Sequence, residues 1–217
     1  MSRYYDVDGA LCVSVTTALS VIRKPGLEYW RGKHGNEEAD NLLHEAGDLG
    51  SYVHDLCEMV NRGEPWEQRS PNSDIWCMVN AYQEWFSANV RSVARVEEVV
   101  ANEVYRYAGR LDLEARLKGD RATAAIDIKT GKTVYPDTAL QLSAYVEALA
   151  REGKKPKRRL VVHLDKAAPG KLTIKEYAAD KHDRDYRMFL YALELYRYFN
   201  SGAKPDEIIN IKRRGTA

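Results

Sequence analysis

The 217-residue sequence has few cysteines and no long apolar run, and each absence narrows the class of protein. Cys12, Cys57 and Cys77 lie far apart and form no C-x-x-C pair. A disulfide framework is therefore not expected, and a four-thiolate zinc or iron–sulfur site would lack a ligand. No apolar stretch approaches the ~20 residues that span a bilayer, and the N-terminus lacks the basic-then-apolar pattern of a secretory signal. These absences predict a cytoplasmic protein with no membrane partner.

The sequence also lacks an excess of charge and a phosphate-binding loop. A net charge of +1 provides no overall field for nucleic acid, so such a partner would need local basic patches. Two are present, KKPKRR at 154–159 and KRR at 212–214, although both are also typical of solvated loops or tails. The GKT at 131–133 has no upstream glycine, which excludes a Walker-type motif.

What is present is ordinary globular composition, with 44% apolar and 30% charged residues, in a length that suits one domain over 1–217. Apolar periodicity in 1–92 is mainly helical, and it predicts helices at 14–22, from Pro25, at 38–61 and after Asn72. In 93–217 the period changes to two, and it predicts strands at 96–106, 109–117, 122–129, 159–164 and 171–177, with helices at 137–151 and 183–200. The predicted fold is α/β: a mixed central sheet, made of an antiparallel hairpin and a βαβ crossover, flanked by helices.

Three charged residues interrupt the hairpin over 108–132. A two-residue type II′ loop at Gly119-Asp120 would set Asp112 directly opposite Asp127, with Lys129 on the same face. The alternate residues are expected to point into a core; they are Leu111, Leu113, Ile126 and Ile128. Facing carboxylates repel each other, so something positive should lie between them. Lys129 and Arg110 could serve as counter-charges on an ordinary surface, or a divalent cation such as Mg²⁺ or Mn²⁺ could bind there.

Two helical pairs accompany the hairpin. His54 and Glu58 are four residues apart and share a helix face, as do Gln141 and Tyr145 on the helix after the D-x-K strand. Such pairs are common on solvated helices, and each is a weak signal by itself.

The ordered motifs GSYVHDLCE (50–58), GRLD (109–112), IDIKTGK (126–132) and LQLSAY (140–145) resemble the RecB-like branch of the PD-(D/E)XK nuclease superfamily. The similarity is greatest to phage-type nucleases and the mitochondrial genome maintenance exonuclease group, whose opening segment resembles SVTTALSVI (14–22) and LEYWRG (27–32). This resemblance implies a restriction-endonuclease-like fold and a bacterial or phage-infected host cell.

The resemblance also implies roles for individual residues. Asp112 and Asp127 match the metal-binding acids, His54 matches the metal-ligand histidine of the branch, and Lys129 matches the lysine that positions or activates water. The Ile128 backbone carbonyl would complete the metal shell, with Glu58 and Glu103 at acidic positions seen in relatives. Gln141 and Tyr145 match the polar pair that orients water and phosphate. One or two Mg²⁺ or Mn²⁺ ions are implied, and the cysteines cannot supply the iron–sulfur cluster of some relatives.

The implied function is a metal-dependent DNA nuclease, with an exonuclease on single-stranded ends in replication, recombination or repair favoured. The implied partners are DNA and proteins of replication or recombination. A structure-specific or restriction-like endonuclease is one alternative, and a non-catalytic nucleic-acid-binding subunit is another. A small-molecule enzyme using His163 and Asp165 is a third. Tyr4, Tyr5, Trp30 and Tyr52 are candidates for base stacking, with core packing as the competing role.

Overall fold

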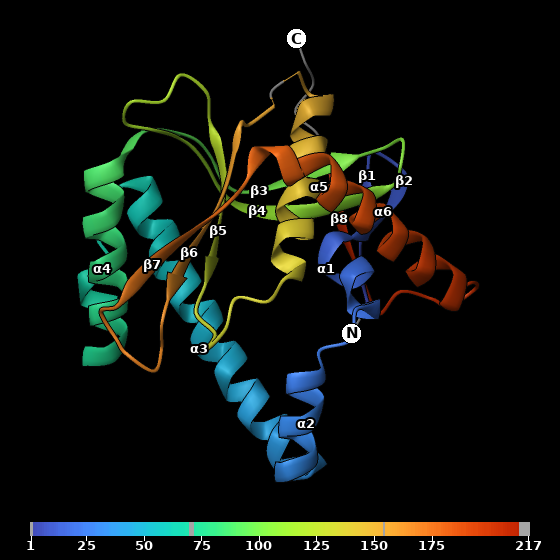
Figure 1. The fold of residues 1–217 in the computed structure, drawn as a ribbon, viewed down its shortest axis with the longest axis horizontal. Helices are drawn as coiled ribbons and strands as arrows, with labels where there is room; N and C mark the ends of the chain where they lie inside the picture. The colour runs from blue at the N-terminus through green and yellow to red at the C-terminus, as the bar shows by residue number, and fades with distance from the viewer. Residues whose placement is uncertain (1, 70–71, 154, 213–217) are drawn as a thin grey trace.

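An eight-stranded mixed sheet forms the centre of the molecule, in the order β7-β6-β5-β4-β2-β1-β8, with β3 also paired to β4 (Figure 1). The computed structural model describes residues 2–69, 72–153 and 155–212. The strands are β1 (Arg3–Val7), β2 (Ala10–Ser14), β3 (Val90–Asn102), β4 (Tyr107–Leu117), β5 (Ala124–Lys129), β6 (Arg158–Leu164), β7 (Leu172–Tyr177) and β8 (Glu207–Ile211). The helices are α1 (Val15–Ala18), α2 (Pro25–His34), α3 (Asn36–Arg62), α4 (Ser73–Asn89), α5 (Asp137–Arg151) and α6 (His182–Phe199), with short 3-10 turns η1 (Leu19–Val21), η2 (Glu67–Arg69) and η3 (Ala179–Lys181). The predicted α/β class with a mixed sheet flanked by helices is confirmed.

Helices cover the sheet in two layers. On one side α3 and α4 bury apolar side chains, among them Leu56 and Val79, against Ile126 and Ile128 of β5. A second core lies beneath α5 and α6, which appear on the other side of the sheet in Figure 1. α2 and the first turns of α3 extend beyond the sheet at the bottom of that view. No helix in the described part of the chain is long and apolar enough to cross a membrane.

Local signals placed most helix ends correctly. The hydroxyl of Ser14 accepts from the Thr17 N–H at the start of α1, and the Asn72 side chain caps α4 in the same way. Gly63 ends α3 in the left-handed conformation, with φ 72°. β5 and β6 pair in parallel across α5, as the strand–helix–strand pattern predicts.

The N-terminal part is mainly helical, as predicted, but it begins with two strands within residues 3–14 that were not predicted. β1 and β2 form an antiparallel hairpin in which Val7 faces Ala10. Asp8 and Gly9 make the connection with φ 51° and 86°, the type I′ combination that an Asp-Gly pair favours. The Asp8-Gly9 pair could have predicted this hairpin, but it was overlooked because the residues that follow have helical periodicity. β8, which pairs in parallel with β1, was also not predicted.

The β4–β5 hairpin has the predicted register but not the predicted turn. Leu113 faces Ile126, and Ala115 faces Ala124, in the register that would bring Asp112 opposite Asp127. Pairing ends at Ala115 and Ala124, so the connection is longer than two residues and the type II′ loop was wrong. Instead the Asp120 N–H donates to the Leu117 carbonyl across a tight turn, with Gly119 at φ 89°.

β4 is irregular at Asp112. Leu113 packs in the α3–α4 core as expected, but Leu111 packs beneath α5 and α6, so the prediction of one shared core was wrong for Leu111. Glu97 of β3, across from this point, has φ 50°, and in the described structure the β3–β4 ladder has no Glu97–Asp112 pair between Val96–Leu113 and Glu98–Leu111. The positive φ disturbs the regular alternation of the strands.

Both β5 and β2 pair with the edge of β4 that β3 leaves open. β5 pairs with 113–115 and β2 with 107–108, so in the described structure no strand pairs with 109–112 on that edge. This break in the sheet exposes Asp112 to side chains from the surrounding helices.

Candidate metal-dependent active site

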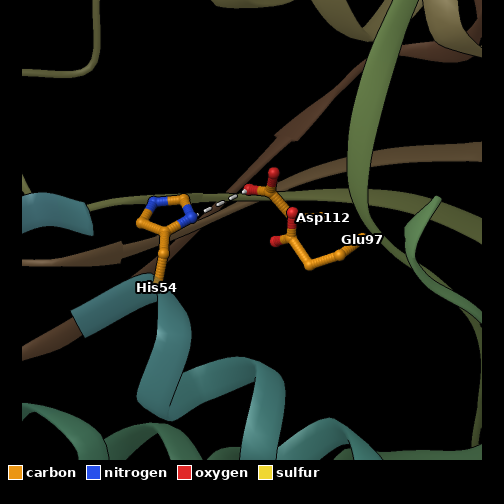
Figure 2. A group of neighbouring side chains, drawn as sticks. All are labelled: His54, Glu97 and Asp112. Atoms are coloured by element: carbon orange, nitrogen blue, oxygen red, sulfur yellow. Dashed lines mark ion pairs between the residues drawn. The ribbon is translucent and has the colours of Figure 1, made fainter. Parts of the chain in front are cut away.

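Three side chains with metal-ligand chemistry meet beside residues 109–112 of β4, where one edge of the strand has no partner. They are His54 from α3, Glu97 from β3 and Asp112 from β4 (Figure 2). One ligand atom of each lies within 4.8 Å of the others, and Nδ1 of His54 is 3.7 Å from Oδ2 of Asp112. α3 presents His54 here because its neighbours Val53 and Leu56 are buried against the sheet. Packing of the apolar helix face therefore fixes where the imidazole lies.

Asp112 also joins β4 to the end of β5. Its Oδ2 accepts a 2.7 Å hydrogen bond from the backbone N–H of Ile128. This bond holds the carboxylate beside the D-x-K segment, although the regular β4–β5 pairing stops at Leu113.

Asp127 forms a second polar group beneath α5. The residue is 1% exposed, and its Oδ1 accepts from Nζ of Lys129 at 2.9 Å and from Nε2 of Gln141 at 3.0 Å. Nζ of Lys129 also lies 3.4 Å from Oε1 of Gln141, and Nε2 of Gln141 lies 3.2 Å from the Tyr145 hydroxyl. The structure thus brings together all four of these predicted residues.

The glycine of the GRLD motif has a packing reason. A Cβ on Gly109 would lie 2.7 Å from Cε1 of Tyr145, closer than real contacts of this kind. Because Gly109 has no side chain and lies where one edge of β4 is unpaired, the Tyr145 ring can approach the backbone and keep its hydroxyl near Gln141.

Two acids in this region, Glu97 and Asp127, have raised pKa values. Burial raises the pKa of Glu97 to about 8, and the charges of Asp112 and Glu58 add to the effect. Burial also raises the pKa of Asp127, although the Lys129 ammonium partly opposes that shift. Burial lowers the pKa of Lys129, but Asp127 and Asp112 outweigh this, so its pKa rises and Lys129 remains a cation. The site therefore holds more acid than its own cations can neutralise.

A divalent cation fits this arrangement. Two carboxylates and an imidazole offer both oxygen and nitrogen ligands to a metal ion. Mn²⁺ binds readily to both kinds of ligand, whereas Mg²⁺ prefers the carboxylate oxygens. Asp127 lies close to this group, and its charge is already paired with the Lys129 ammonium, whose Nζ lies 2.8 Å from Oδ2 of Asp127.

Two predicted acids do not join the cluster. The carboxylate of Glu58 lies 2.7 Å from the Arg62 guanidinium, its ion-pair partner one turn along α3, although its charge reaches Glu97. Glu103 lies in the turn between β3 and β4, so it is not an exposed strand residue either.

Glu97 was missed by the sequence reading. The signal was the acidic pair Glu97-Glu98 in the strand before GRLD, together with a hairpin turn at 103–106. That turn would have aligned Glu97 with Asp112, but the predicted strand ran through it to residue 106.

The four aromatic residues that were candidates for base stacking differ in their burial. Tyr5 is 2% exposed within a small core of its own, which rules out base stacking. Tyr4 is half-buried against the α5–α6 core, and the Tyr52 hydroxyl donates to the Arg69 carbonyl. Trp30 is half-buried on α2, with its ring centroid 4.7 Å from that of His34.

The basic patch at 154–159 is partly structural. Arg159 is buried and paired with Asp185, and Arg158 forms ion pairs with Asp120 and Glu176. Neither guanidinium is a ready contact for nucleic acid. In the second patch, residues 213 and 214 lie outside the described residues.

Comparison with known proteins agrees with this geometry. The family model described as "PD-(D/E)XK nuclease superfamily" matches residues 75–206, more than half of the chain. The chain belongs to the PD-(D/E)XK nuclease superfamily. The matched segment contains Asp112, Asp127, Lys129, Gln141 and Tyr145. No curated protein matches the sequence.

A solved structure shares the PD-(D/E)XK fold of this chain. It is a protein from Eubacterium rectale described as a "Putative exonuclease", with a TM-score of 0.53 and 14% sequence identity. The similarity covers 89% of this chain and 83% of the other. At this identity the likeness establishes the shared fold alone. PD-(D/E)XK nucleases are hydrolases that typically use a divalent metal, which accords with the donor set at His54, Glu97 and Asp112.

Proposed function

We propose that this chain is a RecB-like, Mg²⁺- or Mn²⁺-dependent deoxyribonuclease that acts as an exonuclease on single-stranded DNA ends in replication, recombination or repair. The single observation that carries the proposal is the meeting of His54, Glu97 and Asp112 next to the Asp127–Lys129 pair. An acid-rich centre beside one fixed ammonium suits metal-assisted phosphodiester hydrolysis.

Residues in this centre have distinct roles. His54, Asp112 and Asp127 would hold the cation with the Ile128 carbonyl, and we add Glu97 to this set, leaving Glu58 as an outer partner through its charge. When bound, the ion would neutralise charge on the phosphate oxygens and lower the pKa of a water ligand.

The remaining residues position the substrate. Lys129 is held by Asp127 and Gln141, so its ammonium points to one place and can stabilise charge that develops on the phosphate. Gln141 is fixed by Asp127 and Tyr145, which leaves its amide pre-oriented for water or phosphate. Because these partners are already in place, little reorganisation is needed during the reaction.

Labelled DNA tests the function directly. Single- and double-stranded oligonucleotides labelled at the 5′ or 3′ end would be incubated with Mg²⁺, Mn²⁺ or EDTA, using wild-type protein, Lys129→Ala and the exposed-residue control Lys171→Ala. We expect metal-dependent shortening from an end by wild type and control, and none by Lys129→Ala. Cleavage that persists in EDTA or in Lys129→Ala would contradict the mechanism.

The same assay separates the alternatives. Degradation of closed circular DNA would identify an endonuclease, because a circle offers no end. Tight DNA binding without cleavage under any metal condition would identify a non-catalytic subunit. A Mn²⁺ titration in which the unfolding temperature is measured at each concentration would report metal binding by His54 and the acids without depending on activity.

A further inference from the structure

A large cavity lies between the α2–α3 pair and the loop that follows β5, in the part of Figure 1 where α2 extends below the sheet. Its volume is about 750 Å³, within the range of ligand-binding pockets. The lining includes Trp30, His34, Leu43, Lys132, Tyr135 and Lys166. None of these residues belongs to the metal-binding cluster.

The chemistry of the lining differs from that of the active centre. The charged side chains that line this cavity are lysines, and no acid is among its lining residues. Neither Lys132 nor Lys166 forms an ion pair with a described residue, so both ammonium groups are available. Trp30 and Tyr135 add flat aromatic surface. Available cations together with aromatic faces suit a chain of phosphates and bases.

A second cavity borders this one at the catalytic lysine. It has a volume of about 330 Å³, its lining includes Lys129 and Gln141, and it shares Thr133 and Tyr135 with the larger cavity. On the other side α3 packs closely on the loop, since a Cβ on Gly50 would lie 3.1 Å from Oγ1 of Thr130. Tyr135 therefore borders both the larger cavity and the cavity of Lys129 and Gln141.

We propose that the cavity of Trp30, Tyr135, Lys132 and Lys166 binds unpaired nucleotides next to the phosphodiester that is cut. Stacking on Trp30 and Tyr135 requires bases whose faces are free, so the ligand is single-stranded DNA and not a duplex. Its place beside the bond that is cut rests on the proposed nuclease function, whereas the binding itself does not require catalysis.

Binding in EDTA tests this site without turnover. Fluorescence anisotropy would follow a labelled 15-mer of thymidylate and a duplex of equal length, with wild type, Trp30→Ala and the double variant Lys132→Ala/Lys166→Ala. We expect Trp30→Ala to weaken single-strand binding on the order of tenfold. The double variant should also lower the slope of log Kd against log salt by about 2, one for each lost phosphate contact.

Matched controls keep the test specific. Trp76, which is 43% exposed on α4, serves as the indole control, and Lys157→Ala/Lys171→Ala controls for charge. Trp30→Phe retains an aromatic face for stacking, so it should preserve affinity. DNA should quench less of its tryptophan fluorescence than in wild type, because the Trp30 contribution is gone. This variant also serves if Trp30→Ala does not fold, as judged by circular dichroism.

The outcomes divide clearly. Wild-type affinity in Trp30→Ala and in the lysine pair, equal losses in the controls, or duplex binding as tight as single-strand binding would each overturn the proposal. If the variants lose affinity as expected while the wild type never cleaves DNA, the strand-binding site stands and the nuclease function fails. If the wild type cleaves DNA, Trp30→Ala should raise KM more than it lowers kcat.

Discussion

Two charged clusters lie beneath α5, and they are built in opposite ways. In the first, Arg159 of β6 and Asp185 of α6 are 3.0 Å apart, with side chains only 3% and 6% exposed. Arg159 also donates to the carbonyls of Ala139 and Ala178 and to the hydroxyl of Ser143. The pair has balanced charge, and the guanidinium has several acceptors within the protein.

In the second cluster, the charge is not balanced. His54, Glu97 and Asp112 lie near the Asp127–Lys129 ion pair, so three carboxyl groups share one lysine and one histidine. Burial raises the pKa of both Glu97 and Asp127. The comparison indicates that the first cluster joins the sheet to two helices, whereas the second accepts a stability cost in exchange for a site that can hold a cation.

Asp127→Asn should have the largest effect, and on activity alone. Loss of a charged metal ligand should reduce cleavage on the order of ten-thousandfold, about 5.5 kcal/mol at ~1.36 kcal/mol per factor of ten. The free energy of unfolding in EDTA should change by only about 1 kcal/mol, because the amide is cheaper to bury than the carboxylate and Lys129, whose side chain is 32% exposed, can turn its ammonium to solvent. Kinetics and urea unfolding of the same preparation would measure both.

Asp185→Ala should show the reverse pattern. Removing one partner of a buried pair leaves Arg159 uncompensated, so unfolding should become easier by about 3–5 kcal/mol. Asp183→Ala, at an exposed site in the same first turn of α6, is the control and should change stability little. If Asp185→Ala were as stable as its control, the structural role of the Arg159 cluster would be wrong.

Gly109→Ala should perturb the second cluster through packing. The added methyl group would displace the Tyr145 ring, which we expect to cost about 1–3 kcal/mol of stability and to lower activity by moving Gln141. Gly47→Ala provides the contrast, because nothing lies within 4 Å of its added Cβ on the exposed face of α3. That variant should be stabilised by up to about 1 kcal/mol. Thermal unfolding of both variants would show whether close approach or backbone freedom dominates.

Glu97→Gln should change the pH dependence of stability. The folded carboxyl keeps its proton to a pKa of about 8, whereas the unfolded one loses it near 4.5. The stabilising contribution of the proton is therefore full below pH 4.5 and is lost as pH rises through 8. In EDTA, wild type should lose about 2 kcal/mol between pH 6.5 and 8.5, while Glu97→Gln should not. Equal slopes for the two proteins would show that burial of Glu97 does not control this range.

Much of the fold could be predicted because its signals are local. Pro25, Gly63 and Asn72 mark helix ends through their own backbone or side-chain chemistry, and α5 spans the predicted residues 137–151. The β4–β5 register could also be predicted, although the turn was wrong, because alternating apolar residues fix which side chains face the core. The site residues on β4, β5 and α5 could be predicted because their periodicity is also a local signal.

The remaining features depend on contacts between distant segments. Glu97 reaches Asp112 only because β3 pairs along β4 with a left-handed residue at that point, and the break in β4 exists only because β5 and β2 share one edge. The cavity at Trp30 likewise needs α2 to lie near the loop after β5.

The sequence by itself determined most of the helices, the β4–β5 register and the chemical identity of Asp112, Asp127 and Lys129, since these depend on local propensity and strand alternation. Only the tertiary structure decided that Glu97 joins the cluster, that Arg159 is internal and that Tyr5 is core. These outcomes depend on how separate layers pack, and packing brings together residues whose spacing along the chain carries no record of their proximity.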